Sequence, residues 1–198
     1  KYILYLGIAA TICFGLFVFI KLHSEDKGRV GTWMARIENF RKGDTDGNYQ
    51  SDQAKIAIAS GGLMGKFPGN STQRNFLPHP YSDFIYAIIC EEYGLWGAIL
   101  IMFLYVLLFF RVIRFVNHSP RAFATLLAVG CSFSLVFQAM INMAVAVNLF
   151  PVTGQTLPLV SMGGTSTLFT SLALGIILSV SREVEKEKKE GGMQLAAA

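Results

Sequence analysis

The sequence predicts an all-α polytopic membrane protein with four transmembrane helices and a long extracytoplasmic loop. Of its 198 residues, 53% are hydrophobic and only 15% are charged, a balance more apolar than that of ordinary soluble domains. The apolar residues gather in segments of about 20 residues, the helix length that crosses the hydrocarbon core of a bilayer. A soluble globular domain is therefore excluded, and helices that span a membrane are expected.

The N-terminal part of the chain contains one predicted span and the long loop. Residues 2–20 carry no charge and form the first predicted transmembrane helix, with an uncleaved signal sequence as the alternative. Residues 21–81 form the large polar loop. Within it, residues 31–41 predict a short amphipathic helix, and residues 55–64 predict a second short helix that breaks at two glycines. Loops of this length usually carry function.

Three further hydrophobic segments follow, separated by short loops. Residues 82–116 combine a polar helix start with the second transmembrane helix. Residues 122–147 and 159–181 form the third and fourth. The connecting loops cover residues 117–121 and 148–158. Each span is long enough to cross a bilayer as a helix.

Basic residues predict the orientation of these helices. Cytoplasmic loops of membrane proteins carry an excess of Lys and Arg. Three arginines flank the loop at residues 117–121, and the tail at residues 182–198 contains the run REVEKEKKE. Lys1 falls on the same side of the membrane in this topology. We therefore expect a cytoplasmic C-terminus and a long loop that faces outward.

A carboxylate lies where the polar loop turns into an apolar helix. The stretch LPHPYSDFIYAIICEEYGLWG places Ser82 as the expected N-cap and Asp83 at the helix start. Glu91 and Glu92 follow in a segment that otherwise resembles a membrane-embedded helix, where acidic side chains are costly. From spacing alone, Asp83 serves either to stabilise the helix N-terminus or as a functional carboxylate.

Polar residues in the third span predict contacts between helices. Gln138 and Asn142 lie four residues apart on one helix face, as do Ser134 and Gln138. Interhelical hydrogen bonds are the favoured interpretation. The three cysteines lie in apolar segments and are interpreted as buried small side chains, so neither a disulfide nor a metal site is expected.

Two long motifs stand in the chain in a fixed order. The first is YQSDQAKIAIASGGLMGKFPGNSTQRNFLPHPYSDFIYAIICEEYGLWG, and the second is PVTGQTLPLVSMGGTS. Both resemble motifs of the SEDS family (shape, elongation, division and sporulation proteins), whose second motif is P-x-T-G-x-x-L-P-x-x-S-x-G-G-x-S. The segment RIENF and the loop spacing are closer to the division branch, FtsW or its sporulation relative SpoVE, than to the elongation branch RodA. The family usually has a histidine where this chain has Tyr81, and His79 stands two positions early.

The resemblance implies a bacterial cytoplasmic (inner) membrane protein with ten helices, of which this chain matches the last four. Family members polymerise lipid II into glycan strands during cell division or growth. The implied function is a peptidoglycan glycosyltransferase at the division site, with a lipid II flippase or a non-catalytic division scaffold as the alternatives. The implied partners are lipid II and lipid-linked glycan, a class B penicillin-binding protein transpeptidase, other divisome membrane proteins and the membrane, with no nucleic acid. A chain that lacks six helices is expected to be inactive alone.

Asp83 matches the family's proposed catalytic aspartate, which implies a general base that activates the acceptor hydroxyl. A direct carboxylate pair with Glu91 is not expected. At about 1.5 Å per residue, Glu91 lies roughly 12 Å further along the helix, whereas carboxylates that act on one glycosidic bond lie about 5–9.5 Å apart. Glu91 and Glu92 are therefore expected to support helix packing by pairing with a basic or amide group, or else to line the substrate cavity.

The leaving diphosphate needs positive charge or backbone donors. The substrate-binding candidates in the long loop are Lys55, Gly61, Gly62, Lys66 and Arg74. For each basic residue among them, a solvated loop charge is the alternative. A second set is Ser161, Gly163 and Gly164, which either pack helices closely or line an outer cavity. No cofactor is required, although a divalent cation (Mg²⁺ or Mn²⁺) could assist the diphosphate at a site that the sequence does not assign.

Overall fold

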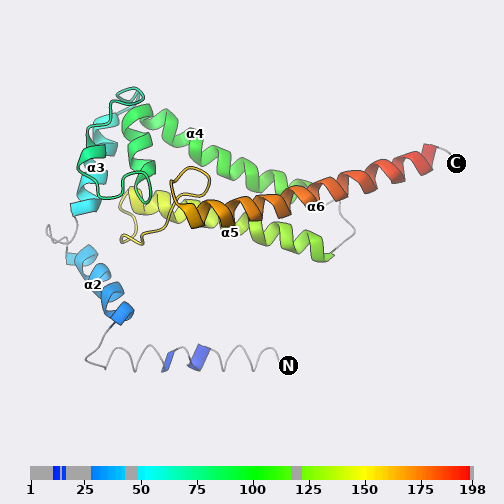
Figure 1. Cartoon of the computed structure of the whole chain (residues 1–198), viewed down its shortest axis with the longest axis horizontal. Coiled ribbons are helices and arrows are strands. Elements are labelled where there is room, and N and C mark those ends of the chain that lie inside the picture. The colour runs from blue at the N-terminus through cyan, green and yellow to red at the C-terminus, as the bar shows by residue number, and fades with distance from the viewer. Residues whose placement is uncertain (1–10, 14, 17–27, 43–48, 117–121, 197–198) are drawn as a thin grey trace. The chain divides into compact units, whose positions relative to one another are not determined.

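The computed structural model describes residues 11–13, 15–16, 28–42, 49–116 and 122–196. Every regular element in these ranges is helical, and no strand occurs among them, which confirms the all-α class. The chain divides into two compact units, Lys1–Tyr49 and Gln50–Ala198, which are coloured from blue to red along the chain in Figure 1.

The first unit contains helix α2, Gly28–Lys42. It confirms the short helix predicted over residues 31–41, and Trp33, Met34 and Ile37 lie exposed on it. The transmembrane helix predicted over residues 2–20 falls mostly outside the described residues, of which 11–13 and 15–16 are helical.

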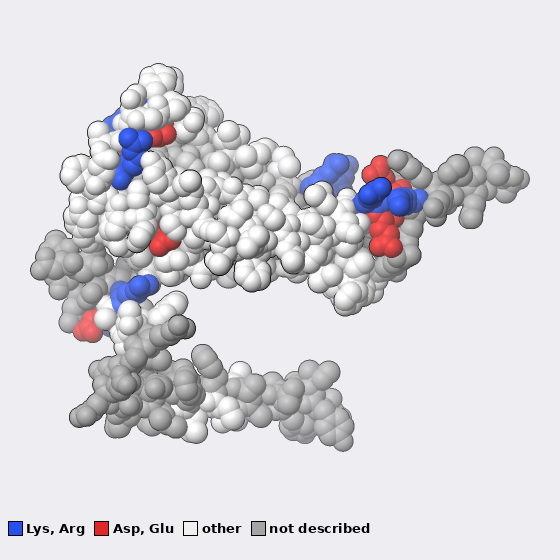
Figure 2. Space-filling view, viewed as in Figure 1, with Lys and Arg blue, Asp and Glu red and all other residues white. Residues whose placement is uncertain are grey.

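The second unit contains three helices that are long and apolar enough to cross a membrane. They are α4 (Ile85–Val116), α5 (Ala122–Ala146) and α6 (Gly164–Ala196). These helices confirm a polytopic architecture, and Figure 2 shows that uncharged residues cover most of their visible length. The remaining predicted span is the first, at residues 2–20. The loop predicted at residues 117–121 also lies outside the described residues.

Helix α6 differs from the predicted fourth span at both ends. It begins at Gly164 rather than at residue 159, because the preceding residues form a turn in which Leu159 has a φ of 68°. The helix then continues without a break through the charged tail to Ala196. Lys and Glu are good helix formers, so the charged sequence extends the helix beyond its apolar part.

Helices α4, α5 and α6 pack along one another in Figure 1. Small side chains allow the close approach, since Ala128 and Ala139 of α5 are completely buried. Around Ala128, Val112 of α4 and Ile177 of α6 complete an apolar cluster. Many larger apolar side chains of the three helices point outward, as expected for surfaces that face lipid or other helices.

Helix α3, Tyr49–Gly61, packs against the beginning of α4. Ala54 and Ala57 are completely buried in this contact, and Phe84 lies against them. Helix α3 ends at Gly61, within the segment where the sequence predicted a helix break. A loop with one short 3-10 helix, η1 (Gln73–Asn75), then leads to α4.

Helix α4 is bent at Gly94, where φ is 66° and ψ is −161°. These angles are outside the range that residues with a side chain adopt readily, so the bend requires glycine. The bend interrupts the backbone ladder of the helix. The amide of Leu95 donates instead to the carbonyl of Gly62 at 3.0 Å, and this bond ties the loop after α3 to the bend.

Candidate functional site

Asp83 lies two residues before α4, at the end of the α4–α6 bundle where the loop between α5 and α6 folds back. We call this end of the bundle, with Ser82, Asp83 and residues 154–161, the Asp83 mouth. The Ser82 hydroxyl donates a hydrogen bond to Asp83 Oδ1 at 2.8 Å. Since α4 begins at Ile85, Ser82 lies too far upstream to be the N-cap that the sequence predicted. Its hydroxyl binds the carboxylate rather than a helix amide, so one carboxylate oxygen is held by the protein.

Asn142 of α5 fixes the backbone beside this carboxylate. Its side-chain amide donates to the carbonyl of Asp83 at 2.9 Å and to that of Gln155 at 2.6 Å. The Asn142 side chain is almost completely buried. The contact joins the segment before α4 to the loop between α5 and α6, so Asn142 bonds to loop backbone rather than to another helix as the sequence predicted.

The loop between α5 and α6 covers the same mouth. The Ser161 hydroxyl donates to the carbonyl of Ser82 at 2.6 Å and accepts a hydrogen bond from the amide of Leu157 at 2.7 Å. Gln138 of α5 donates to the carbonyl of Thr156 at 3.0 Å. At Gly154, an added Cβ would lie 3.7 Å from Asp83 Oδ2, so the loop backbone runs next to the carboxylate.

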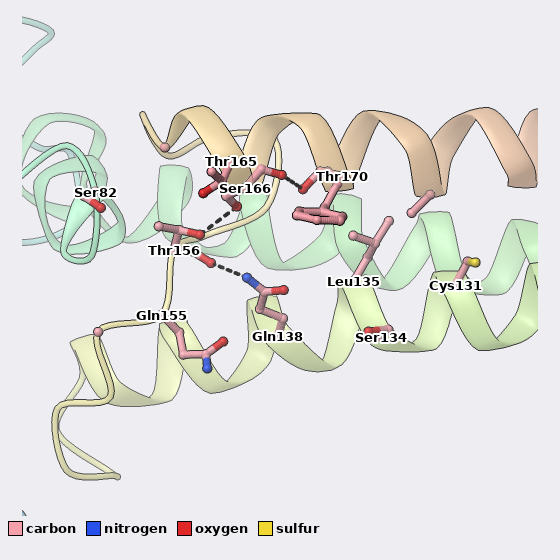
Figure 3. Close-up of a pocket in the computed structure, with 14 residues that line it drawn as sticks. Ser82, Cys131, Ser134, Leu135, Gln138, Gln155, Thr156, Thr165, Ser166 and Thr170 are labelled. Carbon is pink, nitrogen blue, oxygen red and sulfur yellow. Dashed lines mark hydrogen bonds between the residues drawn. The ribbon is translucent and has the colours of Figure 1, made fainter. Parts of the chain in front are cut away.

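A cavity of about 640 Å³ opens between α5, α6 and this loop (Figure 3). Ser82 and Gly154 lie on its edge, so the cavity begins beside Asp83. Its polar side chains are neutral hydroxyls and amides, namely Ser82, Ser134, Gln138, Gln155, Thr156, Thr165, Ser166 and Thr170. Phe169 adds an aromatic ring. Such a lining suits an uncharged ligand rich in hydroxyl and amide groups, such as a sugar.

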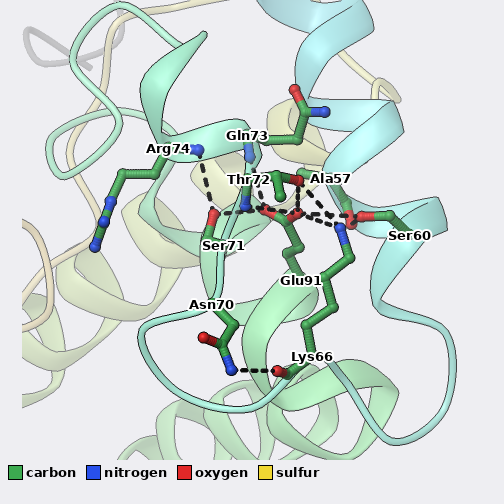
Figure 4. Close-up of polar contacts among 9 residues, drawn as sticks. All are labelled: Ala57, Ser60, Lys66, Asn70, Ser71, Thr72, Gln73, Arg74 and Glu91. Atoms are coloured by element: carbon green, nitrogen blue, oxygen red, sulfur yellow. Dashed lines mark hydrogen bonds and ion pairs between the residues drawn. The ribbon is translucent and has the colours of Figure 1, made fainter.

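Glu91 organises a second polar centre, between α4 and the loop after α3 (Figure 4). Its side chain is 0% exposed. The Lys66 ammonium forms an ion pair with it at 2.7 Å. Further donors to the Glu91 carboxylate are the hydroxyls of Ser60, Ser71 and Thr72 and the backbone amides of Thr72 and Gln73. Six donors therefore converge on one buried carboxylate.

Backbone contacts dock the same loop onto α4. The Lys66 amide donates to the Glu91 carbonyl at 2.9 Å. An added Cβ at Gly61 would lie 2.0 Å from the Cys90 carbonyl oxygen, and one at Gly65 would lie 2.2 Å from the Glu92 carbonyl oxygen. Neither position tolerates a side chain at these distances. These two glycines let the loop backbone lie directly on the helix backbone.

The predicted site residues fall into separate groups. Ser161 and Gly163 lie at the mouth near Asp83, with Gly163 lining the cavity and Gly164 beginning α6. Gly61, Gly62 and Lys66 belong to the loop that docks on α4, where Lys66 faces Glu91. Their roles toward a substrate remain predictions.

Three other predicted residues lie outside these two centres. Lys55 is exposed on α3 and pairs with Asp52 at 3.0 Å. The side chains of Arg74 and Glu92 are half-buried. Gly154, Gln155 and Thr156 belong to the second motif but were not among the predicted site residues, because the motif does not show that this loop folds over a carboxylate.

The described residues contain no group of three or more His, Cys, Asp or Glu side chains that could hold a metal ion. The predicted divalent cation thus has no assigned ligands within these ranges. All three cysteines are free, but only Cys90 is buried. Cys13 is exposed and Cys131 is half-buried, contrary to the expectation of burial, because a side chain on a membrane helix can face outward from the protein.

A family model described as "Cell cycle protein", that of FtsW, RodA and SpoVE, matches residues 1–186. The chain is 43% identical over 141 residues to the "Probable peptidoglycan glycosyltransferase FtsW" of Coxiella burnetii, which covers 69% of this chain and 38% of the relative. It is 42% identical over 135 residues to "Stage V sporulation protein E" of Bacillus subtilis, which covers 68% of this chain and 37% of the relative.

The FtsW relative of Enterococcus hirae is 37% identical over 158 residues, which cover 79% of this chain and 40% of the relative. The chain therefore spans about two fifths of the length of these curated relatives. A solved structure described as "Structural coordination of polymerization and crosslinking by a peptidoglycan synthase complex" matches with a TM-score of 0.63 and 27% identity. That match covers 88% of this chain and 49% of the other.

Proposed function

Because the chain belongs to the FtsW, RodA and SpoVE family of cell cycle proteins, we propose that the protein polymerises lipid II into peptidoglycan glycan strands. The names of the FtsW relatives support glycosyltransferase activity at the level of the family. The observation that carries the proposal for this chain is the position of Asp83. Its carboxylate borders a cavity lined by neutral hydroxyl and amide groups, as a sugar acceptor would require.

In the proposed reaction, Asp83 is the general base. It takes the proton from a hydroxyl of the acceptor sugar as that oxygen attacks the anomeric carbon of the donor, and the lipid diphosphate leaves with the bonding electrons. Ser82 holds Oδ1 at 2.8 Å, so Oδ2 is the oxygen that would accept the proton. A positioned general base contributes about 10²–10⁴ in rate. The neighbouring cavity would hold the acceptor ring in place.

We further propose that the diphosphate is held by the glycine-rich loop after α3 and by its basic residues. Arg74 is the better candidate there, because Lys66 already pairs with the buried Glu91 carboxylate. A Mg²⁺ or Mn²⁺ ion bound together with the substrate would supply further positive charge.

We also propose a setting for this activity in the bacterial cell. The three membrane-compatible helices and the FtsW relatives indicate a multi-pass bacterial membrane protein. Within it, the proposed arrangement puts the Asp83 mouth outside and the C-terminus in the cytoplasm, at the division site. The proposed partners are a class B penicillin-binding protein and other divisome membrane proteins. The matched peptidoglycan synthase complex supports a polymerase that works beside a crosslinking enzyme.

The test is Asp83→Asn in the complete gene product, reconstituted with its transpeptidase partner and assayed for glycan formation from lipid II. We expect a loss of about 10²–10⁴-fold, because the amide cannot accept the proton. The matched control is Asp52→Asn, which changes an exposed carboxylate on α3 that pairs with Lys55. The control should retain normal activity.

Thermal unfolding of both variants checks that the fold is intact. Normal glycan formation by a folded Asp83→Asn variant would refute the general base. If the wild-type protein moved lipid II across the membrane without polymerising it, the flippase alternative would replace the proposed function.

A further inference from the structure

The loop after α3 presents large apolar side chains outward. Leu63, Met64 and Phe67 are 67%, 81% and 72% exposed. They lie within the run from Gly61 to Gly69, whose single charged residue is Lys66. We call Leu63, Met64 and Phe67 the loop tip. Exposed apolar groups that cluster in this way indicate a surface that another apolar phase covers.

Three backbone hydrogen bonds fix the loop that carries the loop tip. The Leu95 amide donates a hydrogen bond to the Gly62 carbonyl at 3.0 Å, and the Gly65 amide donates to the Gly61 carbonyl at 2.8 Å. The Lys66 amide donates to the Glu91 carbonyl at 2.9 Å. Phe67 adopts a φ of 70°, which is strained for a residue with a bulky side chain. The Phe67 ring is 72% exposed, so within the described residues this conformation presents the ring outward rather than burying it.

The single charge of this run is turned inward. The Lys66 ammonium pairs with the buried Glu91 carboxylate at 2.7 Å while its side chain stays 32% exposed, so this charge is directed toward Glu91 and away from the loop tip. A charge that faced hydrocarbon would be costly, whereas one that faced water or a polar protein surface would cost little. The inward ion pair therefore favours lipid over water as the phase that contacts the tip.

The position of the loop along α4 fits a membrane boundary. The Gly62–Leu95 bond puts the loop base level with Leu95. From there, Leu95–Phe110 carries no charge and extends roughly 24 Å at about 1.5 Å per residue. Arg111 and Arg114 follow, and their long side chains can reach the opposite interface of a hydrocarbon core about 30 Å thick. Trp96 and Tyr93, which are 70% and 50% exposed, lie at the same level. Trp and Tyr are enriched at this boundary.

We propose that the loop tip inserts into the adjacent leaflet of the membrane, with Leu63, Met64 and Phe67 among the lipids. The docked loop thereby anchors the bend of α4 at a fixed depth. Since Asp83 lies two residues before the α4 segment that leads to the bend, the anchor sets the height of the Asp83 carboxylate above the hydrocarbon. With the Asp83 carboxylate at a fixed height, the headgroup of a lipid-linked molecule could reach it without a change in the depth of the protein in the membrane.

The test uses Phe67→Trp in the complete gene product, in a background in which every native tryptophan, Trp33 and Trp96 included, is changed to Phe. The protein is reconstituted in vesicles of phosphatidylethanolamine and phosphatidylglycerol, with or without phosphatidylcholine brominated on its acyl chains. We expect blue-shifted emission, about a twofold loss of emission with brominated lipid, and protection from aqueous acrylamide. Met64→Trp in the same background gives an independent measurement.

The matched control is Asn75→Trp, at an exposed position in η1 of the same loop. Its emission should respond to acrylamide and not to brominated lipid. Equal acrylamide quenching at positions 67 and 75 would show that the loop tip faces water. Protection of position 67 from both quenchers would show that protein covers it. Either result would overturn the proposal.

Discussion

The ion pair between Lys66 and Glu91 allows a quantitative test of how the loop is held on α4. Glu91→Ala removes a carboxylate that is 0% exposed and leaves six donors without their acceptor. A buried donor left without an acceptor costs about 1–3 kcal/mol, so losing the acceptor that several buried donors share costs about 3–5 kcal/mol. The Lys66 ammonium can turn to water, since its side chain is 32% exposed, but the buried Ser71 hydroxyl cannot.

Lys66→Met should be milder. The carboxylate keeps its hydroxyl and amide donors, and only one hydrogen bond to a charged group is lost, worth about 1.5–3 kcal/mol. Lys55→Met is the matched control. Its partner Asp52 is exposed, and exposed ion pairs contribute at most about 1 kcal/mol.

Hydrogen–deuterium exchange of peptides that cover residues 62–76 measures these differences as local opening. With about 1.4 kcal/mol per factor of ten, Glu91→Ala should speed exchange there by about 10²–10⁴ and Lys66→Met by about 10–10². Lys55→Met should change it by no more than about fivefold. The double variant at positions 66 and 91 should exchange no faster than Glu91→Ala, because the two residues share one interaction.

Equal opening of the loop by Lys66→Met and Glu91→Ala would contradict this account of how the carboxylate is held. That result would mean that the five other donors contribute nothing. Exchange at the wild-type rate in both variants would show that the backbone contacts alone hold the loop.

Two further substitutions test the other contacts. Gly94→Ala should destabilise the protein by at least about 3 kcal/mol, because its φ of 66° is strained for alanine and the new Cβ would meet loop backbone atoms at 2.5 Å. Gly130→Ala, with open space around it, should be neutral or stabilising by up to about 1 kcal/mol in the same thermal unfolding experiment. Asn142→Leu should lower glycan formation while the protein still folds, because the carbonyls of Asp83 and Gln155 lose their shared donor. Unchanged glycan formation would show that this contact is not needed to position Asp83.

The fold class was predictable because it depends on chain length and hydropathy alone. Spans at residues 82–116, 122–147 and 159–181 correspond to α4, α5 and α6, since a bilayer requires each backbone polar group to be paired within the helix. The end of α6 was harder to predict. Charge ends a membrane span but does not end a helix, so the tail continues in helical form to Ala196.

Contacts between distant segments were less predictable. The sequence indicated that Glu91 needs a partner and that Asn142 bonds across helices. It did not identify Lys66 or the carbonyls of Asp83 and Gln155 as those partners, because hydropathy periods carry no information on which loop folds back to which helix. The N-cap expected at Ser82 was wrong for a local reason, because α4 begins at Ile85 and the Ser82 hydroxyl donates to the carboxylate of its neighbour Asp83.

The sequence by itself determined the helical membrane architecture, the position of Asp83 at a loop–helix junction and the resemblance to a family. Each of these depends on the order of residues along the chain. Only the tertiary structure decided that Lys66 faces Glu91 rather than open solvent, that the loop tip is left exposed, and that a neutral cavity opens beside Asp83. The first two features arise where glycines at positions 61, 65 and 94 let two backbones touch, and the cavity arises where the loop between α5 and α6 lies beside those helices. Such contacts form only when the chain is folded.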